Sequence, residues 1–244
     1  MRYNSDKTLI TNENAYGILK AFANEYKRQN GEAPAEIIIV GGGSIMLNYG
    51  FRKSTQDFDI MISGGGADIK NIIHYIADKY NLPNDWMNTD FKRTISYSSK
   101  LRQVSSHMFS FNHNSLEIRT VKDEYLIAMK MISARQYRND LSDIVGILLF
   151  AKQNNNPIAY RTVENAIIEL YDSTKNIKSE VIERVKRYSS MNESELSDEY
   201  SKLKEDENKT LEDLQDIDNK YKGVVNEASL DTVIAALRRK ENKS

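Results

Sequence analysis

The sequence predicts an α/β (α+β) fold in which a small mixed sheet, flanked by helices, precedes a helical C-terminal region. Two observations predict it. Up to residue 121, short β-branched or alternating runs of strand length are interspersed with amphipathic stretches of helical period. From Asp123 onward only the helical periodicity remains. We therefore expect three units, over residues 1–122, 123–190 and 191–244.

The first predicted helix and strand precede a run of glycines. Residues 11–30 place apolar side chains every three or four positions, which predicts an amphipathic helix capped by Thr11 or Asn12. The run 36–40 (EIIIV) is β-branched and ends in three glycines, so it predicts a buried strand. A short helix over 44–49 should begin at this glycine turn.

The next predicted elements are a strand, a helix and a hairpin. Polar and apolar residues alternate over 56–63, which predicts a second strand. A glycine turn and an amphipathic helix over 67–80 follow, and Pro83 ends that helix. After an irregular stretch rich in Ser, Asn and Arg, two strand-like segments over 106–111 and 115–120 predict a hairpin.

The second half of the chain is predicted to be helical. Residues 124–153 and 160–171 have helical periodicity. Residues 191–222 are rich in acidic and poor in apolar side chains, which is typical of a solvated helix. A short amphipathic helix over 229–240 closes the chain with a basic end.

Composition excludes several classes of protein. The chain has 244 residues, with 34 Lys and Arg against 35 Asp and Glu, so the net charge is −1. This balance argues against a protein that coats nucleic acid by bulk charge, although it allows a local basic groove. The absence of cysteine excludes disulfides, thiolate metal sites and cysteine nucleophiles. The polar first residues and the shortness of every apolar run predict a soluble, cytoplasmic protein with no membrane partner.

Two carboxylates in the second predicted strand are candidates for a metal site. Residues two apart in a strand point to the same face, so Asp57 and Asp59 project together while Phe58 and Ile60 face the core. Two such carboxylates repel each other unless a cation lies between them. Their oxygens suit Mg²⁺, and a pair of ions can activate an attacking hydroxyl and stabilise a leaving phosphate. Glu117, in the last predicted strand, is the candidate third ligand.

The glycine turn before the short helix is a candidate phosphate site. Gly42, Gly43 and Ser44 leave backbone N–H groups free at a helix N-terminus, where the helix dipole favours anions such as a triphosphate. Small residues also let a phosphate approach the backbone closely. No Gly-Lys-Ser/Thr follows, which excludes a P-loop.

These features carry a resemblance to a known family. One stretch resembles the signature of the polymerase-β-like nucleotidyltransferase superfamily, a Gly-Gly-Ser turn followed by Asp-x-Asp, in GGGSIMLNYGFRKSTQDFDIMI. Arg52 and the Ser54-Thr55 pair resemble the AbiEii-type toxin branch, which also carries a helical Lys, an Arg-rich stretch and Asp-x-x-Asp. The matching positions here are Lys130, Arg135, Arg138, Asp140 and Asp143. The resemblance covers roughly residues 36–150.

The resemblance implies a nucleotidyltransferase fold, with residues 1–122 as the catalytic domain, and a role for each matching residue. The implied metal ligands are Asp57, Asp59 and Glu117, the last being Asp more commonly in relatives. The implied nucleotide-binding residues are Gly42, Gly43, Ser44, Arg52 and Lys130. Asp57, Asp59, Lys130, Asp140 and Asp143 are the residues implied in catalysis.

The reaction so implied is the transfer of a nucleoside monophosphate from an NTP to an acceptor hydroxyl, with Mg²⁺ as the cofactor and pyrophosphate as the product. The AbiEii-type resemblance further implies a toxin–antitoxin or phage-defence setting. It implies tRNA or a protein as the acceptor, and an antitoxin protein as a partner.

Two other interpretations stay open. A catalytically inactive module of the same fold could use its cleft, or the acidic segment 191–222, to bind a partner protein or nucleic acid. Such a module would be indifferent to Mg²⁺ and to Asp59→Asn, whereas a catalyst would lose NTP binding. Alternatively, a nucleic-acid-binding protein could use the stretch 86–102, where Trp86, Phe91 and Tyr97 are interleaved with Lys and Arg.

Overall fold

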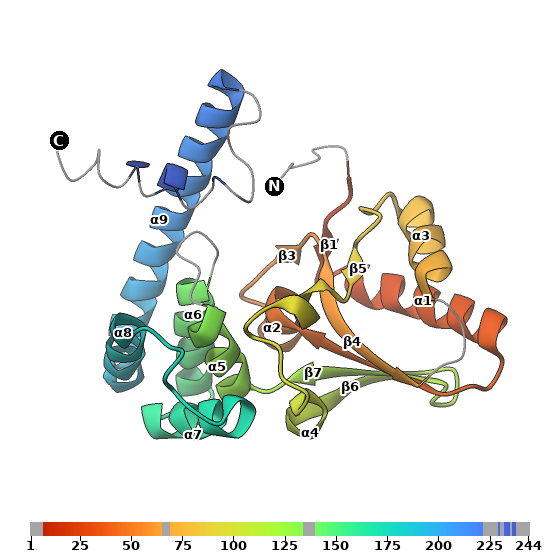
Figure 1. The fold of residues 1–244 in the computed structure, drawn as a ribbon, viewed down its shortest axis with the longest axis horizontal. Coiled ribbons are helices and arrows are strands. Elements are labelled where there is room, and N and C mark those ends of the chain that lie inside the picture. The colour runs from red at the N-terminus through yellow and green to blue at the C-terminus, as the bar shows by residue number, and fades with distance from the viewer. Residues whose placement is uncertain are drawn as a thin grey trace.

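The structure, a computed structural model, describes residues 7–64, 69–133, 140–221, 229, 232–234 and 236–237. Strands and helices mix in the first half of the chain, and the described elements of the second half are helices (Figure 1). The strands are β1 (Ile10–Thr11), β2 (Ala35–Val40), β3 (Ser54–Thr55), β4 (Phe58–Gly64), β5 (Met87–Asn88), β6 (Ser105–Phe111) and β7 (Leu116–Val121). The helices are α1 (Ala15–Asn30), α2 (Gly41–Tyr49), α3 (Ile69–Tyr80), α4 (Leu101–Val104), α5 (Asp123–Ser133), α6 (Asp140–Gln153), α7 (Tyr160–Tyr171), α8 (Ser179–Ser190) and α9 (Glu193–Lys220), with a 3₁₀ turn η1 (Asp90–Arg93).

The main sheet is small and mixed, as predicted. Its five strands follow the order β5-β4-β2-β7-β6. β2 runs parallel to β7 and antiparallel to β4, whereas β5 is parallel to β4 and β6 is antiparallel to β7. A separate antiparallel pair joins β1 to β3. The predicted α/β fold, with a small mixed sheet and a helical C-terminal region, is confirmed.

The central position of β2 explains its β-branched sequence. Ile37 and Ile39 contact the cluster under α1 and α3, whereas Ile38 and Val40 belong to the cluster on the opposite side of the sheet. All four side chains are buried. A strand with both faces covered needs apolar residues at consecutive positions, and the run EIIIV supplies them.

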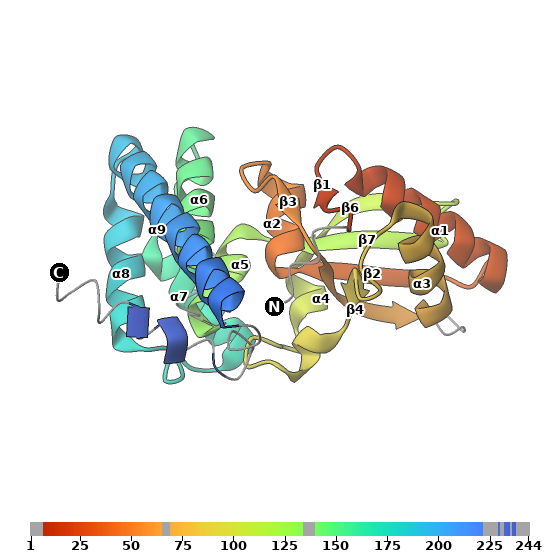
Figure 2. The same ribbon diagram turned by 90° about the horizontal axis from the view of Figure 1, so that it is seen from above.

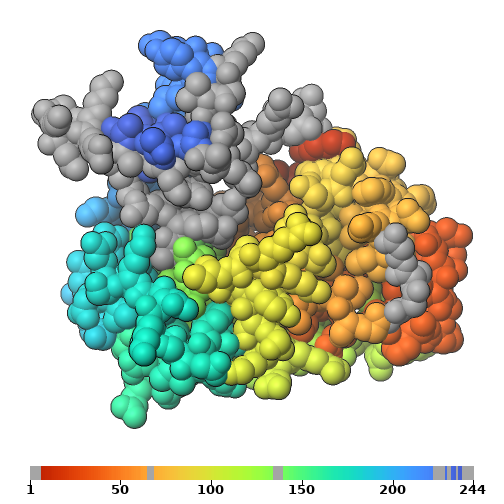
Figure 3. Space-filling model, viewed as in Figure 1, coloured from red at the N-terminus to blue at the C-terminus, as the bar shows by residue number. Residues whose placement is uncertain are grey.

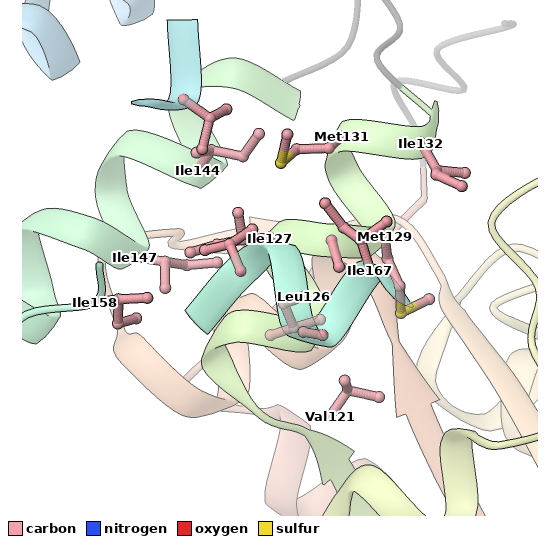
Figure 4. Close-up of a cluster of buried hydrophobic side chains, with 14 of the residues drawn as sticks. Val121, Leu126, Ile127, Met129, Met131, Ile132, Ile144, Ile147, Ile158 and Ile167 are labelled. Carbon is pink, nitrogen blue, oxygen red and sulfur yellow. The ribbon is translucent and has the colours of Figure 1, made fainter. Parts of the chain in front are cut away.

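Two hydrophobic clusters lie on the two sides of the sheet. The first packs α1 and α3, which lie together at the right of Figure 1, against one face, with Phe22, Phe58 and Trp86 fully buried in it. The second joins the other face to α2 and the C-terminal helices, and Figure 4 shows its centre around Leu126 and Ile127. Because the second cluster includes residues from both halves of the chain, one core connects the sheet to the helices.

The predicted hairpin is formed by β6 and β7. Its turn residues Asn112, His113 and Asn114 all have positive φ, at 53°, 57° and 66°. Asparagine tolerates this left-handed conformation better than most residues, which is why the sequence can turn here without glycine.

The irregular stretch between α3 and β6 connects the sheet to α7. The Ser98 hydroxyl donates to the carbonyl of Leu170, and the Tyr171 hydroxyl donates to the carbonyl of Ser96. In Figure 3 the yellow surface of this stretch lies against the cyan surface of α7. These bonds attach the loop between η1 and α4 to the helical half of the chain.

Several element boundaries differ from the prediction. The helix predicted over 124–153 is two helices, α5 and α6, and residues 134–139 between them, including Arg135 and Arg138, lie outside the described residues. The N-cap of α1 is Asn14, not Thr11 or Asn12.

α8 was not predicted as a separate element, although Val181, Ile182, Val185 and Tyr188 recur at helical spacing and pack against the second cluster.

α9 confirms that the acidic segment is helical. Its N-terminus is a capping box, in which the Asn192 side chain accepts from the Glu195 N–H and the Glu195 side chain accepts from the Asn192 N–H. It runs alongside α6 (Figure 2) and buries few of its residues, Leu196 and Leu214. The helix predicted over 229–240 falls largely outside the described residues. Among the helices described, none is long and apolar enough to cross a membrane.

Candidate active site

The carboxyl end of β2 runs directly into α2. Val40 ends the strand and Gly41 begins the helix, three residues earlier than predicted, with a φ of 60°. Glycine adopts a positive φ without the steric cost that a side chain would add. Val40 supplies no side-chain cap to the first turn of α2. The N-terminus of α2 therefore has the character of an anion site.

Asp57 and Asp59 lie beside this turn. Asp59 pairs with Val40 on one side and with Asn88 of β5 on the other. The Asn88 side-chain amide donates to Asp57 Oδ2 at 3.2 Å. A Cβ atom built on Gly41 would lie 3.6 Å from Asp59 Oδ2. The fold thus brings Asp59 to the N-terminus of α2. Asp57 precedes β4, outside the strand in which it was predicted, and Asn88 joins it to Asp59; both aspartates are half-buried.

Gly42 and Gly43 allow two side chains to pack against the first turn of α2. A Cβ on Gly42 would lie 2.6 Å from Cζ and Nη2 of Arg52, and a Cβ on Gly43 would lie 2.4 Å from Cδ1 of Phe58. Real Cβ atoms do not approach other atoms this closely. The glycines therefore set how near the helix lies to Arg52 and to the strand that carries the two aspartates.

The hydroxyl of Ser44 is hydrogen-bonded to the backbone of β7. It accepts from the Val121 N–H at 3.2 Å and lies 3.5 Å from the Val121 carbonyl, to which it donates. The Asn48 side chain donates to the same carbonyl at 2.9 Å. Ser44 is fully buried, so these bonds anchor α2 to the end of β7. Because α2 begins at Gly41, the Ser44 N–H makes the first hydrogen bond within the helix, so the structure assigns Ser44 an anchoring role in place of the predicted nucleotide contact.

Glu117 does not lie with the two aspartates, contrary to the prediction of a third metal ligand. It pairs with Glu36 at the beginning of β2, whereas Asp59 pairs with Val40 at the end. Four residues of strand correspond to about 13 Å. The Glu117 carboxylate instead accepts from Arg119 Nη1 at 3.0 Å. Strand register, which the sequence pattern does not encode, is the reason for the difference.

The metal-binding capacity of the site rests on the aspartate pair. Within the described ranges, no group of three or more His, Cys, Asp or Glu residues is placed to hold a metal ion. Asp57 and Asp59 nevertheless fit Mg²⁺, which commonly takes one or two protein carboxylates and completes its shell with water and substrate phosphates. The donor set suits a Mg²⁺ ion that arrives with a phosphate-bearing ligand.

Four charged side chains form a buried cluster next to α2. Lys130 Nζ on α5 lies 2.8 Å from Asp140 Oδ1 and 2.7 Å from Asp143 Oδ2 on α6. Arg52 Nη1 lies 3.1 Å from the same oxygen of Asp143. The Ser133 hydroxyl donates to Asp140 Oδ2 at 2.9 Å. The fold thus brings together four predicted site residues that are far apart in the sequence.

The two aspartates keep Lys130 charged although it is buried. The Lys130 side chain is 9% exposed, and burial alone would lower the pKa of its ammonium group. The carboxylates of Asp143 and Asp140 outweigh burial, so that its pKa is raised above the ordinary value of 10.5. With Arg52, the cluster contains two cations and two anions and carries no net charge.

The stretch 86–102 does not present the aromatic surface that a nucleic-acid-binding loop would need. Trp86 is fully buried, and its indole N–H donates to the Ile73 carbonyl at 2.9 Å. Phe91 is 5% exposed, and Tyr97 is partly buried with its ring 5.7 Å from that of Phe91. Bases stack on accessible rings. The three rings instead pack in the two hydrophobic clusters.

Asn88 is a site residue that sequence reasoning missed. It lies in β5, a strand of two residues within a stretch that the sequence predicts as irregular. A strand so short has no periodicity to detect. Its position became apparent only from its pairing with Asp59 and its hydrogen bond to Asp57.

We predict that Gly43→Ala destabilises the protein by about 1–3 kcal/mol, because the new Cβ would collide with Phe58. Gly17→Ala is the matched control, since a Cβ there meets no atom within 4 Å and alanine favours the helix by about 0.5–1 kcal/mol. Urea denaturation measures both changes. Equal stability of the two variants would contradict the close packing at Gly43.

We also predict that Lys130→Met costs about 3–5 kcal/mol of folding free energy, because it leaves two buried carboxylates without their cation. The pKa of Lys130 is raised in the folded state, so its stabilising effect is complete below its ordinary pKa and is lost as the pH rises through the raised value. Urea denaturation should therefore give the same loss from about pH 6 to pH 9.

Lys122→Met is the control for this substitution, because Lys122 is exposed just before α5, and we expect a change within about 0.5 kcal/mol. A loss at Lys130 no larger than at Lys122 would show that the cluster does not stabilise the fold.

Comparison with known proteins gives one match. Residues 18–196 match a family model described as a nucleotidyltransferase of unknown function (DUF6036). The matched region runs from α1 into α9 and includes the glycine turn, the aspartate pair and the charged cluster. No curated protein and no solved structure matches the chain. The match supports the nucleotidyltransferase resemblance but does not extend to the AbiEii-type branch. The chain belongs to this family of nucleotidyltransferases of unknown function.

Proposed function

We propose that this protein is an active, Mg²⁺-dependent nucleotidyltransferase that moves a nucleoside monophosphate from an NTP to an acceptor hydroxyl. The observation that carries the proposal is the position of Asp57 and Asp59 beside the N-terminus of α2. The aspartates offer oxygen ligands for a cation, and the N-terminus of α2 favours an anion. A nucleotide with bound Mg²⁺ contains both the cation and the anion.

We assign some of the site residues to the metal and others to the phosphates. Asp57 and Asp59 would hold Mg²⁺, which supplies charge neutralisation on the phosphates and activation of the attacking hydroxyl. The first-turn N–H groups of α2 at Gly42 and Gly43, which have no partner within the helix, would bind phosphate oxygens. Arg52, whose guanidinium lies against Gly42, adds a positive charge at the same turn. Such catalysis consists largely of positioning and electrostatic stabilisation.

The reaction forms one bond and breaks another. The acceptor oxygen bonds to the α-phosphorus of the NTP and gives up its proton. The bond from that phosphorus to the β-phosphate oxygen breaks, and pyrophosphate leaves. An in-line displacement of this kind needs the attacking and leaving oxygens held on opposite sides of the phosphorus.

The acceptor and the biological setting rest on the resemblance to the AbiEii-type branch. From it we infer a tRNA or protein acceptor and a toxin–antitoxin or phage-defence role in the cytoplasm, with an antitoxin protein as a partner. The resemblance is carried by Arg52, Lys130, Asp140 and Asp143, which the fold gathers into one cluster.

A non-catalytic module is the second candidate. It is favoured by one observation, the lack of a third acidic side chain grouped with Asp57 and Asp59 among the described residues. Such a module would bind a partner through the same fold without metal-dependent chemistry.

We predict that purified protein, mixed with α-labelled NTP, Mg²⁺ and a host RNA-and-protein extract, transfers label to RNA or to protein. Asp57→Asn and Asp59→Asn should each lower the transfer rate about 100-fold or more, because each removes a charge that holds the metal. Gel separation followed by nuclease or protease digestion identifies the acceptor.

Glu117→Gln is the matched control, because it removes a carboxylate at the other end of the sheet, and it should change the rate less than about twofold. The absence of both label transfer and Mg²⁺-dependent NTP binding would favour the non-catalytic module. NTP binding without transfer would show that the extract lacks the acceptor.

A further inference from the structure

The surroundings of Lys130 do not suit the phosphate contact that the resemblance implies. Two of its three N–H groups are directed to carboxylates, at 2.8 Å from Asp140 Oδ1 and 2.7 Å from Asp143 Oδ2. Both carboxylates are buried. A phosphate that reached Lys130 would approach two negative charges in a medium that screens them poorly.

Asp143 links Lys130 to Arg52. A single oxygen, Oδ2, lies within hydrogen-bond distance of both Lys130 Nζ and Arg52 Nη1, at 2.7 Å and 3.1 Å. Lys130 fixes this carboxylate from one side, and the carboxylate fixes the guanidinium on the other. Asp140 contacts Lys130 and Ser133, and among the ion pairs of the described residues it is Asp143 that joins Arg52.

Arg52 occupies a place where a cation is normally disfavoured. Its guanidinium lies against the first turn of α2, since a Cβ on Gly42 would be 2.6 Å from its Cζ. The N-terminus of a helix carries a partial positive charge, which repels cations. Asp143 holds Arg52 there against that repulsion, and an anion at the same turn would relieve it.

The second terminal nitrogen of Arg52 is available to such an anion. Nε donates to the Ser54 carbonyl and Nη1 donates to Asp143, whereas Nη2 has no partner within the part of the chain that the structure describes. Nη2 is the atom nearest to Gly42, together with Cζ. The side chain is 23% exposed, so a ligand can reach it.

We propose that Asp143, fixed by Lys130, is the positioning residue that holds Arg52 against the N-terminus of α2, and that Arg52, rather than Lys130, contacts a phosphate of the nucleotide. This inference rests on the proposed function, because it assigns roles within the same nucleotide site. The charged cluster is then a support for one phosphate-binding side chain.

Asp143→Asn and Asp140→Asn form the matched pair that tests the proposal. Both remove one carboxylate from Lys130 on the same helix, and Asp143 is the one that joins Arg52 among the ion pairs of the described residues. The probe is each of the four NTPs with Mg²⁺, and calorimetry measures the dissociation constant. We expect Asp143→Asn to weaken binding about tenfold and Asp140→Asn to weaken it less than about threefold.

A double-mutant cycle separates positioning from a general loss of structure. If Asp143 acts through Arg52, then Asp143→Asn should change binding less than about twofold in a protein that already carries Arg52→Ala. A purely structural role would weaken binding equally in both backgrounds. Thermal melts of every variant show which ones are folded.

Gly42→Ala provides a second variant that leaves all four charges in place. Its Cβ would displace the Arg52 guanidinium without touching the carboxylates, so we expect a loss of NTP affinity of similar size, about tenfold. Gly17→Ala, in open space on α1, should bind like the wild type.

Each outcome either supports or overturns the inference. Equal effects of Asp140→Asn and Asp143→Asn, or an undiminished effect of Asp143→Asn beside Arg52→Ala, would overturn it and leave the proposed function standing. If the wild type binds no NTP with Mg²⁺, the proposed function fails and the role of Arg52 fails with it. The supporting result has two parts. Asp143→Asn and Gly42→Ala each weaken NTP binding, and Asp143→Asn has no further effect in the protein that carries Arg52→Ala.

Discussion

The close approach of α2 to the beginning of β4 is the contact on which the site depends. Phe58 packs against Gly43, and Asp59, the next residue of β4, lies on the opposite face of the strand. Asp57 immediately precedes the strand and is held by Asn88. Because Gly41 lies next to Asp59, the same packing places the aspartates at the helix N-terminus. The packing that forms this part of the core therefore also forms the candidate site.

The buried charged cluster adds a second constraint, between the sheet and the C-terminal helices. Arg52 follows α2, whereas its partner Asp143 lies on α6 and is shared with Lys130 on α5. Buried ion pairs are costly to desolvate and give little net stability compared with apolar packing. The four balanced charges are better explained by the orientation they impose on Arg52. A hydrophobic replacement could stabilise the helices equally but could not hold a guanidinium beside Gly42.

Local sequence patterns predicted most of the elements and part of the site. The β-branched run of β2, the alternation in β4 and the Asn-rich turn between β6 and β7 each reflect contacts within a few residues. The prediction was incomplete where a strand has only two residues, as in β5 with Asn88. A segment this short shows no periodicity.

The sequence by itself determined that a buried β-branched strand runs into a glycine-rich helix start and that two aspartates flank Phe58, because these features belong to single chain segments. Only the tertiary structure decided which groups meet them. Strand register put Glu117 beside Glu36 and away from Asp59, and helix packing put Lys130 between two aspartates next to Arg52. Register and ion pairing depend on segments distant in sequence, whose relative positions are set by the packing of the whole core.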